Sequence, residues 1–153
     1  MTGGIAEVSD LIMIEPLQET YQKGDELILR CSVPAVNNYF GEEINLHEET
    51  QANSALLTLA QMIEYIRIFE SGNELHFIKG MQGEYPNWMK LAYNPGNANY
   101  ELEIVIKLNT IGEYGIRNYS KIELQDNSNC NRYRLDSSIV GAVNKEIHFT
   151  VVE

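Results

Sequence analysis

Apolar and polar residues alternate along several segments of the chain, most clearly between Tyr100 and Leu108. In that segment Leu102, Ile104, Ile106 and Leu108 alternate with Glu101, Glu103, Val105 and Lys107. Residues 27–33 and 146–151 repeat the pattern. A period of two is typical of a strand with one face on a core and one in water. Because Gly, Asn and Pro turns separate these segments, the chain is predicted to be all-β, a single antiparallel β-sandwich of seven to nine strands.

Two stretches do not follow this alternation. Residues 54–70 are apolar on nearly every side, and their polar residues recur every three positions, which favours a helix. Residues 65–69, however, are rich in β-forming residues and precede a Ser-Gly-Asn turn. We expect strand structure over residues 62–78 and leave residues 54–61 open, with at most one short helix there. Residues 81–99 contain Gly and Pro and are expected to form a long irregular connection.

Two local patterns resemble immunoglobulin-like domains. Gly24-Asp25 followed by Leu27, Leu29 and Cys31 is similar to a B strand, and Gly112-Glu113-Tyr114-Gly115-Ile116 is similar to the start of an F strand. The second resemblance implies that the Tyr114 hydroxyl donates a hydrogen bond back to the main chain, in a tyrosine corner. Ile116 stands where an immunoglobulin domain has its second cysteine, and Trp88 lies too far from Cys31 for the usual core tryptophan.

The chain as a whole resembles small extracytoplasmic lipoproteins of Bacteroidetes-type bacteria, through the segment Tyr21-Gln22-Lys23-Gly24-Asp25. This resemblance implies a location in the periplasm or on the cell surface, and it supplies no catalytic residues. The opening Met1-Thr2-Gly3-Gly4 is small and Gly-rich, as a linker is. We therefore expect a flexible leader over residues 1–9 and an Ig-like β-sandwich domain over residues 10–153.

The chain is acidic, with a formal net charge of −11 over 153 residues. It has no basic stripe for a nucleic-acid backbone, and its charge opposes docking on an anionic membrane surface. No run of eighteen or more apolar residues is present, so no transmembrane segment is expected in this chain.

The chemistry-bearing residues show no catalytic or metal-binding spacing. There is no GxSxG, GxGxxG, P-loop, HExxH or CxxC pattern, so we expect no cofactor and no metal. Asp126-Asn127-Ser128-Asn129 is rich in oxygens but lacks the ligand spacing of a calcium loop. Cys31 and Cys130 either form one disulfide or remain free, with Cys31 in the core and Cys130 in a polar loop.

One cluster of aromatic residues is the candidate binding site: Tyr85, Trp88 and Tyr93 fall within nine positions. Exposed aromatic rings can stack on sugars or fill a partner's pocket, although Trp88 can also cap the core. We expect a non-catalytic binding or interaction module of an exported bacterial protein, with or without a membrane anchor, whose partner is an unknown protein or glycan. The alternatives are a carbohydrate-active hydrolase that uses a carboxylate pair and a structural spacer or fibre-subunit domain.

Overall fold

The computed structural model describes residues 3–125, 130–142 and 146–153. These residues form fourteen strands and one five-residue helix, so the chain is all-β as predicted. The elements, in chain order, are β1 (Gly3–Glu7), β2 (Ile12–Glu15), β3 (Thr20–Gln22), β4 (Glu26–Pro34), β5 (Val36–Asn37), β6 (Ile44–Asn45), α1 (Leu46–Thr50), β7 (Ser54–Gln61), β8 (Glu74–Lys79), β9 (Met81–Gln82), β10 (Trp88–Asn94), β11 (Asn99–Lys107), β12 (Gly112–Gln125), β13 (Arg132–Ser137) and β14 (Glu146–Val152). In these described residues no helix is long and apolar enough to cross a membrane.

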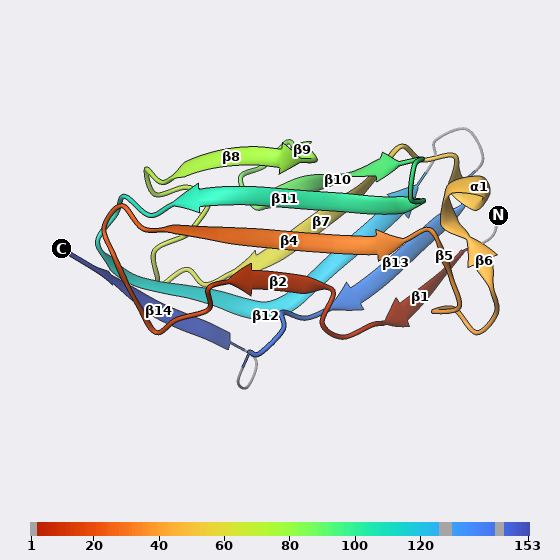
Figure 1. Ribbon diagram of the computed structural model, residues 1–153. Helices are drawn as coiled ribbons and strands as arrows, with labels where there is room; N and C mark the ends of the chain where they lie inside the picture. The colour runs from red at the N-terminus through yellow and green to blue at the C-terminus, as the bar shows by residue number, and fades with distance from the viewer. Residues whose placement is uncertain (1–2, 126–129, 143–145) are drawn as a thin grey trace.

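Twelve of the strands belong to one sheet that bends back over itself into two layers (Figure 1). The order along the sheet is β1-β13-β12-β7-β10-β11-β4-β2; in addition β14 pairs with β12, β3 with β14, β8 with β11 and β9 with β10. At the far end, Ile12 of β2 bridges to Ile139, just after β13. The sheet is mixed, because β1 pairs parallel with β13 and β3 pairs parallel with β14. The observed sheet therefore has more strands than the seven to nine predicted, and it is not purely antiparallel.

The core lies between the two layers and is built by the alternation seen in the sequence. β4 and β11 pair antiparallel over nine residues each, and the apolar positions of both strands point inward. β14 buries Ile147, Phe149 and Val151 in the same way. Side chains at alternate positions of a strand share one face, so these three predicted strands place their apolar residues in one core.

Tyr114 forms the hydrogen bond that the immunoglobulin-like resemblance implied. Its hydroxyl donates to the main-chain oxygen of Thr110 at 2.7 Å, and the ring is fully buried against Phe149. The same hydroxyl accepts a hydrogen bond from the side chain of Asn73 at 3.2 Å. The side-chain oxygen of Asn73 in turn accepts hydrogen bonds from the backbone nitrogens of Asn109 and Thr110. The corner therefore joins the segment before β8 to the turn between β11 and β12.

The prediction of a strand over residues 62–78 is wrong for residues 62–73. Residues 74–79 are strand β8, but they pair with β11 and not with residues 62–69. In the connecting segment Ile68 and Phe69 are buried in the core, while Ile63 is 83% exposed. The β-forming residues of this segment fill the end of the core between the layers, so their composition reflects burial and not strand pairing.

The open segment 54–61 is strand β7, and the helix lies earlier, at residues 46–50. The Asn45 side chain starts this helix, because its oxygen accepts hydrogen bonds from the backbone nitrogens of His47 and Glu48 at 3.0 and 3.1 Å. The polar residues that recur every three positions in 54–70 favoured a helix, but they arise here because apolar residues occupy both faces of β7. β7 is an interior strand that buries Ala55 and Leu57 on one face and half-buries Leu56 on the other.

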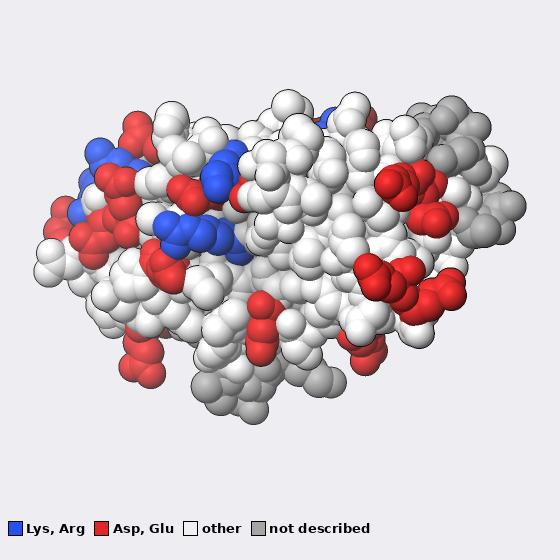
Figure 2. Space-filling view, turned by 45° about the vertical axis from the view of Figure 1, so that its right-hand side comes forward, with Lys and Arg blue, Asp and Glu red and all other residues white. Residues whose placement is uncertain are grey.

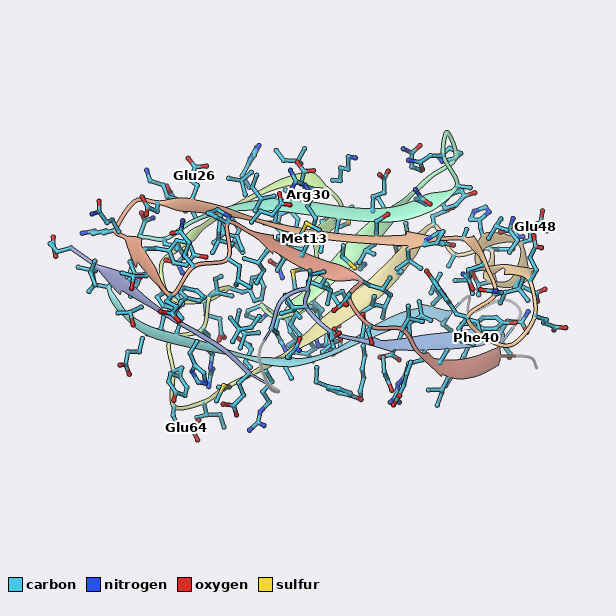
Figure 3. The ribbon with its side chains drawn as sticks, turned by 60° about the horizontal axis from the view of Figure 1, so that its bottom comes forward. Met13, Glu26, Arg30, Phe40, Glu48 and Glu64 are labelled. Atoms are coloured by element: carbon cyan, nitrogen blue, oxygen red, sulfur yellow. The ribbon has the colours of Figure 1, made fainter. Side chains whose placement is uncertain are left out.

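The flexible leader predicted over residues 1–9 is not what the structure shows, because residues 3–7 form strand β1. Gly3 and Gly4 permit close packing here: a Cβ on Gly3 would lie 1.9 Å from the main-chain oxygen of Arg132, and a Cβ on Gly4 would lie 3.1 Å from the ring of Phe40. Figure 3 shows Phe40 beside β1, at the end of the molecule that carries Glu48 of α1. The glycines thus let β1 lie against β13 and Phe40 and do not mark a linker.

The cysteines do not form a disulfide. Cys31 is buried on β4 at 2% exposure, and Cys130 is exposed. Burial raises the pKa of the Cys31 thiol to about 12. The sequence left open either a disulfide or two free cysteines, and the structure has two free cysteines.

Ion pairs concentrate on the outer face of the β2, β4 and β11 layer. Arg30 of β4 contacts both Glu15 and Glu103, and Lys79 contacts Glu101 at 3.1 Å. Figure 2 shows basic side chains next to acidic ones on this side, and acidic side chains alone toward the end that carries α1. Surface pairs of this kind contribute about 0–1 kcal/mol each, so they shape the surface more than they stabilise the fold.

Replacing Tyr114 with phenylalanine should lower the free energy of unfolding by about 1–3 kcal/mol, because the Thr110 carbonyl loses a donor and the Asn73 amide loses an acceptor. Urea denaturation of Tyr114→Phe measures this loss. The matched control is Tyr119→Phe, whose hydroxyl is on an exposed side chain and should matter by less than about 0.5 kcal/mol. Equal effects of the two variants would contradict the role of the corner.

The protein should become less stable as the pH rises above about 9. Burial raises the pKa of Cys31 from 9.0 and that of Tyr100 from 10.0, each to about 12. The unfolded chain therefore loses these protons at lower pH than the folded chain does, so stability is complete below pH 9.0 and falls as the pH approaches about 12. Urea midpoints across this range measure the fall, and Cys31→Ala should have a shallower one. A flat profile would show that these groups ionise freely in the folded state.

Candidate functional site

The hairpin that joins β9 to β10 is held by one side chain. The amide nitrogen of Gln82 donates to the main-chain oxygens of Tyr85, Pro86 and Trp88, at 2.8, 3.2 and 2.8 Å. The two N–H groups of this amide share the three acceptors, of which Tyr85 and Pro86 lie in the turn over residues 83–87 and Trp88 follows it. The side chain therefore holds the turn in one conformation, and with it Tyr85 at the tip.

Two neighbouring residues complete the fixation of this hairpin. A Cβ on Gly83 would lie 2.8 Å from the main-chain oxygen of Trp88, so the close pairing of these residues requires glycine. Asn87 ties the hairpin to β7, because its side chain donates to the main-chain oxygen of Leu59 at 2.9 Å and its own carbonyl accepts from the Leu59 nitrogen at 3.2 Å.

Tyr85 and Trp88 come together on this hairpin. Their ring centroids are 4.5 Å apart with an interplanar angle of 80°, an edge-to-face contact. Tyr85 is 51% exposed and Trp88 is half-buried. Trp88 therefore neither caps the core nor stands free in solvent, and it presents part of its ring at the surface.

Tyr93 lies on the opposite face of β10. Residues 88–94 are a strand and not the irregular connection predicted, so Trp88 and Tyr93 point in opposite directions at a spacing of five. Tyr93 stacks on His47 of α1, with ring centroids 3.9 Å apart, and also contacts Tyr100. The structure thus brings two of the three predicted aromatic residues together and assigns the third to the packing of α1.

Beside Trp88 the outer face of β7, β10 and β12 is hollowed into a groove of about 270 Å³. Polar and charged side chains form most of its lining: Ser54, Leu56, Glu84, Trp88, Lys90, Glu123 and Gln125. The strand register explains why they meet. Lys90 of β10 and Glu123 of β12 both lie opposite Leu56 of β7, one on each side.

A second groove, of about 510 Å³, continues this surface toward β1 and shares Glu123 and Gln125 with the first. It crosses β12, β13 and β1, where Arg134 lies between Glu123 and Ile5 in the register. With its amide oriented to satisfy both groups, Gln125 accepts hydrogen bonds from two nitrogens of Arg132 at 3.2 Å. We refer to the two grooves together as the β10–β1 face.

The charges on the β10–β1 face are less completely paired than those on the opposite layer. Arg134 forms a two-point contact with Asp136, which raises the pKa of its guanidinium further. Among the residues that the structure describes, Lys90 and Lys121 have no carboxylate within 4.0 Å. This side of an acidic protein thus carries Lys90 in the groove and Lys121 on β12, neither of them in an ion pair with a described carboxylate.

A third groove, of about 390 Å³, lies on the face of β12 and β14. Tyr65 packs over the bare Cα of Gly115 and contacts the ring of His148, which in turn lies 2.9 Å from Glu146. Glu19 and Glu113 also line it. Tyr65 is the one tyrosine at the rim of this groove, and among its described lining residues none fixes a turn as Gln82 does. We therefore favour the groove beside Trp88 as the candidate site.

Within the described ranges no group of three or more His, Cys, Asp or Glu side chains could hold a metal ion. The three histidines lie apart, on α1, β8 and β14. The oxygen-rich segment 126–129 considered for calcium lies outside the described residues. Comparison with known proteins finds no matching family model and no similar curated sequence.

The sequence pointed to Tyr85 and Trp88 but not to the residues around them. Leu56, Glu123 and Gln125 come from strands that are distant in sequence, and only the register of β7 between β10 and β12 places them beside Trp88. Nothing in the sequence indicated the role of Gln82 either, because that role depends on the conformation of a turn of five residues. The one local sign of this groove was Leu56, an apolar residue that faces outward on an interior strand.

Removing the Gln82 amide should loosen the turn. We expect Gln82→Ala to cost about 1 kcal/mol of stability and to make Trp88 more accessible to a neutral fluorescence quencher, because three carbonyls lose a shared donor. Stern–Volmer quenching is direct, since Trp88 is the only tryptophan. Gln18→Ala is the control, as Gln18 is exposed and distant in sequence. Unchanged quenching would show that the turn is fixed by its main chain alone.

Proposed function

We propose that this chain is a non-catalytic binding module of an exported bacterial protein, and that it binds its ligand at the Tyr85–Trp88 groove. One observation carries the proposal: Trp88 lines a polar groove and contacts the ring of Tyr85, which stands on a turn whose main-chain oxygens accept from the Gln82 amide. Binding to a site fixed in advance avoids the entropy cost of ordering side chains.

The exposure of these rings supports the same proposal. Tyr and Trp are enriched at the centres of binding surfaces, where each supplies a large contact area and one polar group. Tyr85 is half exposed, so its ring is accessible to a ligand. The remaining lining of the groove adds acceptors on Glu84 and Glu123 and a donor on Lys90, which can orient a ligand against the rings.

We further propose that the scaffold is an elaborated Ig-like sandwich. β2, β4 and β11 are neighbours in the order expected for one Ig-like sheet, and β7, β12 and β13 are neighbours in the order expected for the other. The tyrosine corner of Tyr114 at the start of β12 supports this relation. The additions are β10, which pairs with both β7 and β11, and the short strands β8 and β9.

The proposed location outside the cytoplasm is supported by the resemblance to extracytoplasmic lipoproteins alone. Both cysteines are free, so a structural disulfide gives it no support.

A hydrolase is the second candidate, because one specific arrangement favours it. Glu84 from the turn and Glu123 from β12 both line the groove beside Trp88. Glycosidases act with two carboxyl groups placed on either side of the scissile bond.

A fragment screen tests the proposed site without knowledge of the ligand. In a ¹H–¹⁵N correlation spectrum the indole N–H of Trp88 gives one isolated signal, because the chain has one tryptophan. We expect ring-containing polar fragments at millimolar concentration to shift this signal more often than they shift signals of Tyr65 and His148 in the third groove. Fragments that avoid Trp88 and gather in the third groove would move the function there.

A further inference from the structure

We propose that the ligand is a pyranose oligosaccharide that lies across the strands of the β10–β1 face, from Tyr85 and Trp88 toward Arg132. This inference rests on the proposed binding function and adds to it the class of ligand and its direction. Three features of the face argue for it: the aromatic pair at one end, the donors and acceptors along the floor, and the combined length of the two adjoining grooves.

The aromatic pair suits the apolar face of a sugar ring. A pyranose carries its C–H groups on one face and its hydroxyls at the edge, so it combines stacking with hydrogen bonds. Trp88 presents part of its ring at the groove, and Tyr85 stands edge-on to it. An aromatic ring that packs on such a face contributes dispersion and hydrophobic contact, while polar neighbours set the orientation.

The floor of the face suits hydroxyl groups. A hydroxyl both donates and accepts, and the groove beside Trp88 offers acceptors at Glu84 and Glu123, a donor at Lys90 and an amide at Gln125. Leu56 is its one large aliphatic side chain. A protein partner would be expected to meet a more apolar centre with fewer charges, and a nucleic acid would meet two carboxylates on a chain of net charge −11.

The register gives the length of the site. Lys90, Leu56, Glu123 and Arg134 form one row across β10, β7, β12 and β13. Three strand spacings of about 4.8 Å make this row about 14 Å long, the length of roughly three pyranose rings. The two grooves adjoin at Glu123 and Gln125, which line both of them, so the row from Lys90 to Arg134 passes from one groove into the other. A chain of several sugars therefore fits the face better than a monosaccharide does.

The test is titration of the purified protein with defined hexasaccharides, followed by Trp88 fluorescence and by calorimetry. The probes are β-1,4-linked glucose, xylose and mannose hexamers, an α-1,4-linked glucose hexamer and an α-1,4-linked galacturonate hexamer, each with its monosaccharide. We expect at least one hexamer to bind and to shift Trp88 emission to the blue, and its monosaccharide to bind at least about 10-fold more weakly, since it fills one part of the row.

Four variants locate the bound hexamer. Trp88→Ala should weaken binding at least about 30-fold, as loss of a binding hot spot does. Glu123→Gln, which preserves shape, should weaken it about 10-fold through the loss of a charged acceptor. Tyr65→Ala in the third groove and Glu26→Gln on β4 are the matched controls and should bind like the unaltered protein. Circular dichroism verifies folding of each variant, and Glu123→Gln keeps the test decisive if Trp88→Ala unfolds.

Each contrary result has a distinct meaning. If no hexamer binds while fragments still shift the Trp88 signal, the oligosaccharide inference is overturned and the binding function stands. If no hexamer binds and no fragment shifts the Trp88 signal, both the oligosaccharide inference and the binding function are overturned. If Tyr65→Ala abolishes hexamer binding and Trp88→Ala does not, the sugar site is the third groove and the inference is overturned. If the unaltered protein shortens a bound hexamer and Glu123→Gln does not, the protein is a hydrolase, and the non-catalytic assignment is overturned.

Discussion

The alternation of side chains along β12 is the constraint on which the rest of the structure depends. Over its fourteen residues the strand pairs with β7 on one edge and with β14 and then β13 on the other. Tyr114 and Leu124, at its two ends, point into the core, and Glu113 and Glu123 point outward. One strand therefore carries both the tyrosine corner that closes the core and the carboxylate at the centre of the β10–β1 face.

This alternation survives an irregularity in the strand. Between Ile116 and Ser120, four steps along β12 face only two steps along β7, from Gln61 to Leu59. A bulge of two residues preserves the inward and outward faces, whereas a single extra residue would exchange them. The bulge has a cost: in the described residues the Ser120 hydroxyl and the Gln61 side-chain oxygen are buried without a hydrogen-bond partner. The structure tolerates these two groups, and the outward face of β12 stays continuous as far as Glu123.

The elements that could be predicted are those whose own residues decide their structure. β4 and β11 alternate over nine positions, and their burial follows directly from that pattern. β1 and residues 62–73 could not be predicted, since Gly3 is explained by the backbone of β13, Gly4 by the ring of Phe40, and Ile68 by its burial in the core. The candidate site divides in the same way. Tyr85 and Trp88 are neighbours in the sequence, while Glu123 reaches them only through the pairing of three strands.

The distribution of ion pairs explains why a polar ligand would favour the β10–β1 face over the opposite layer. On the opposite layer Arg30 and Lys79 already contact carboxylates, so a ligand would have to replace existing pairs there. In the described part of the chain no carboxylate lies within 4.0 Å of Lys90 or Lys121. Exchange of water for ligand hydroxyls leaves the number of hydrogen bonds unchanged, and the gain comes from the aromatic contact at Tyr85 and Trp88. Under the proposed function, the polar groups of this face would determine which ligand fits and in which direction it lies, and the two rings would supply most of the affinity.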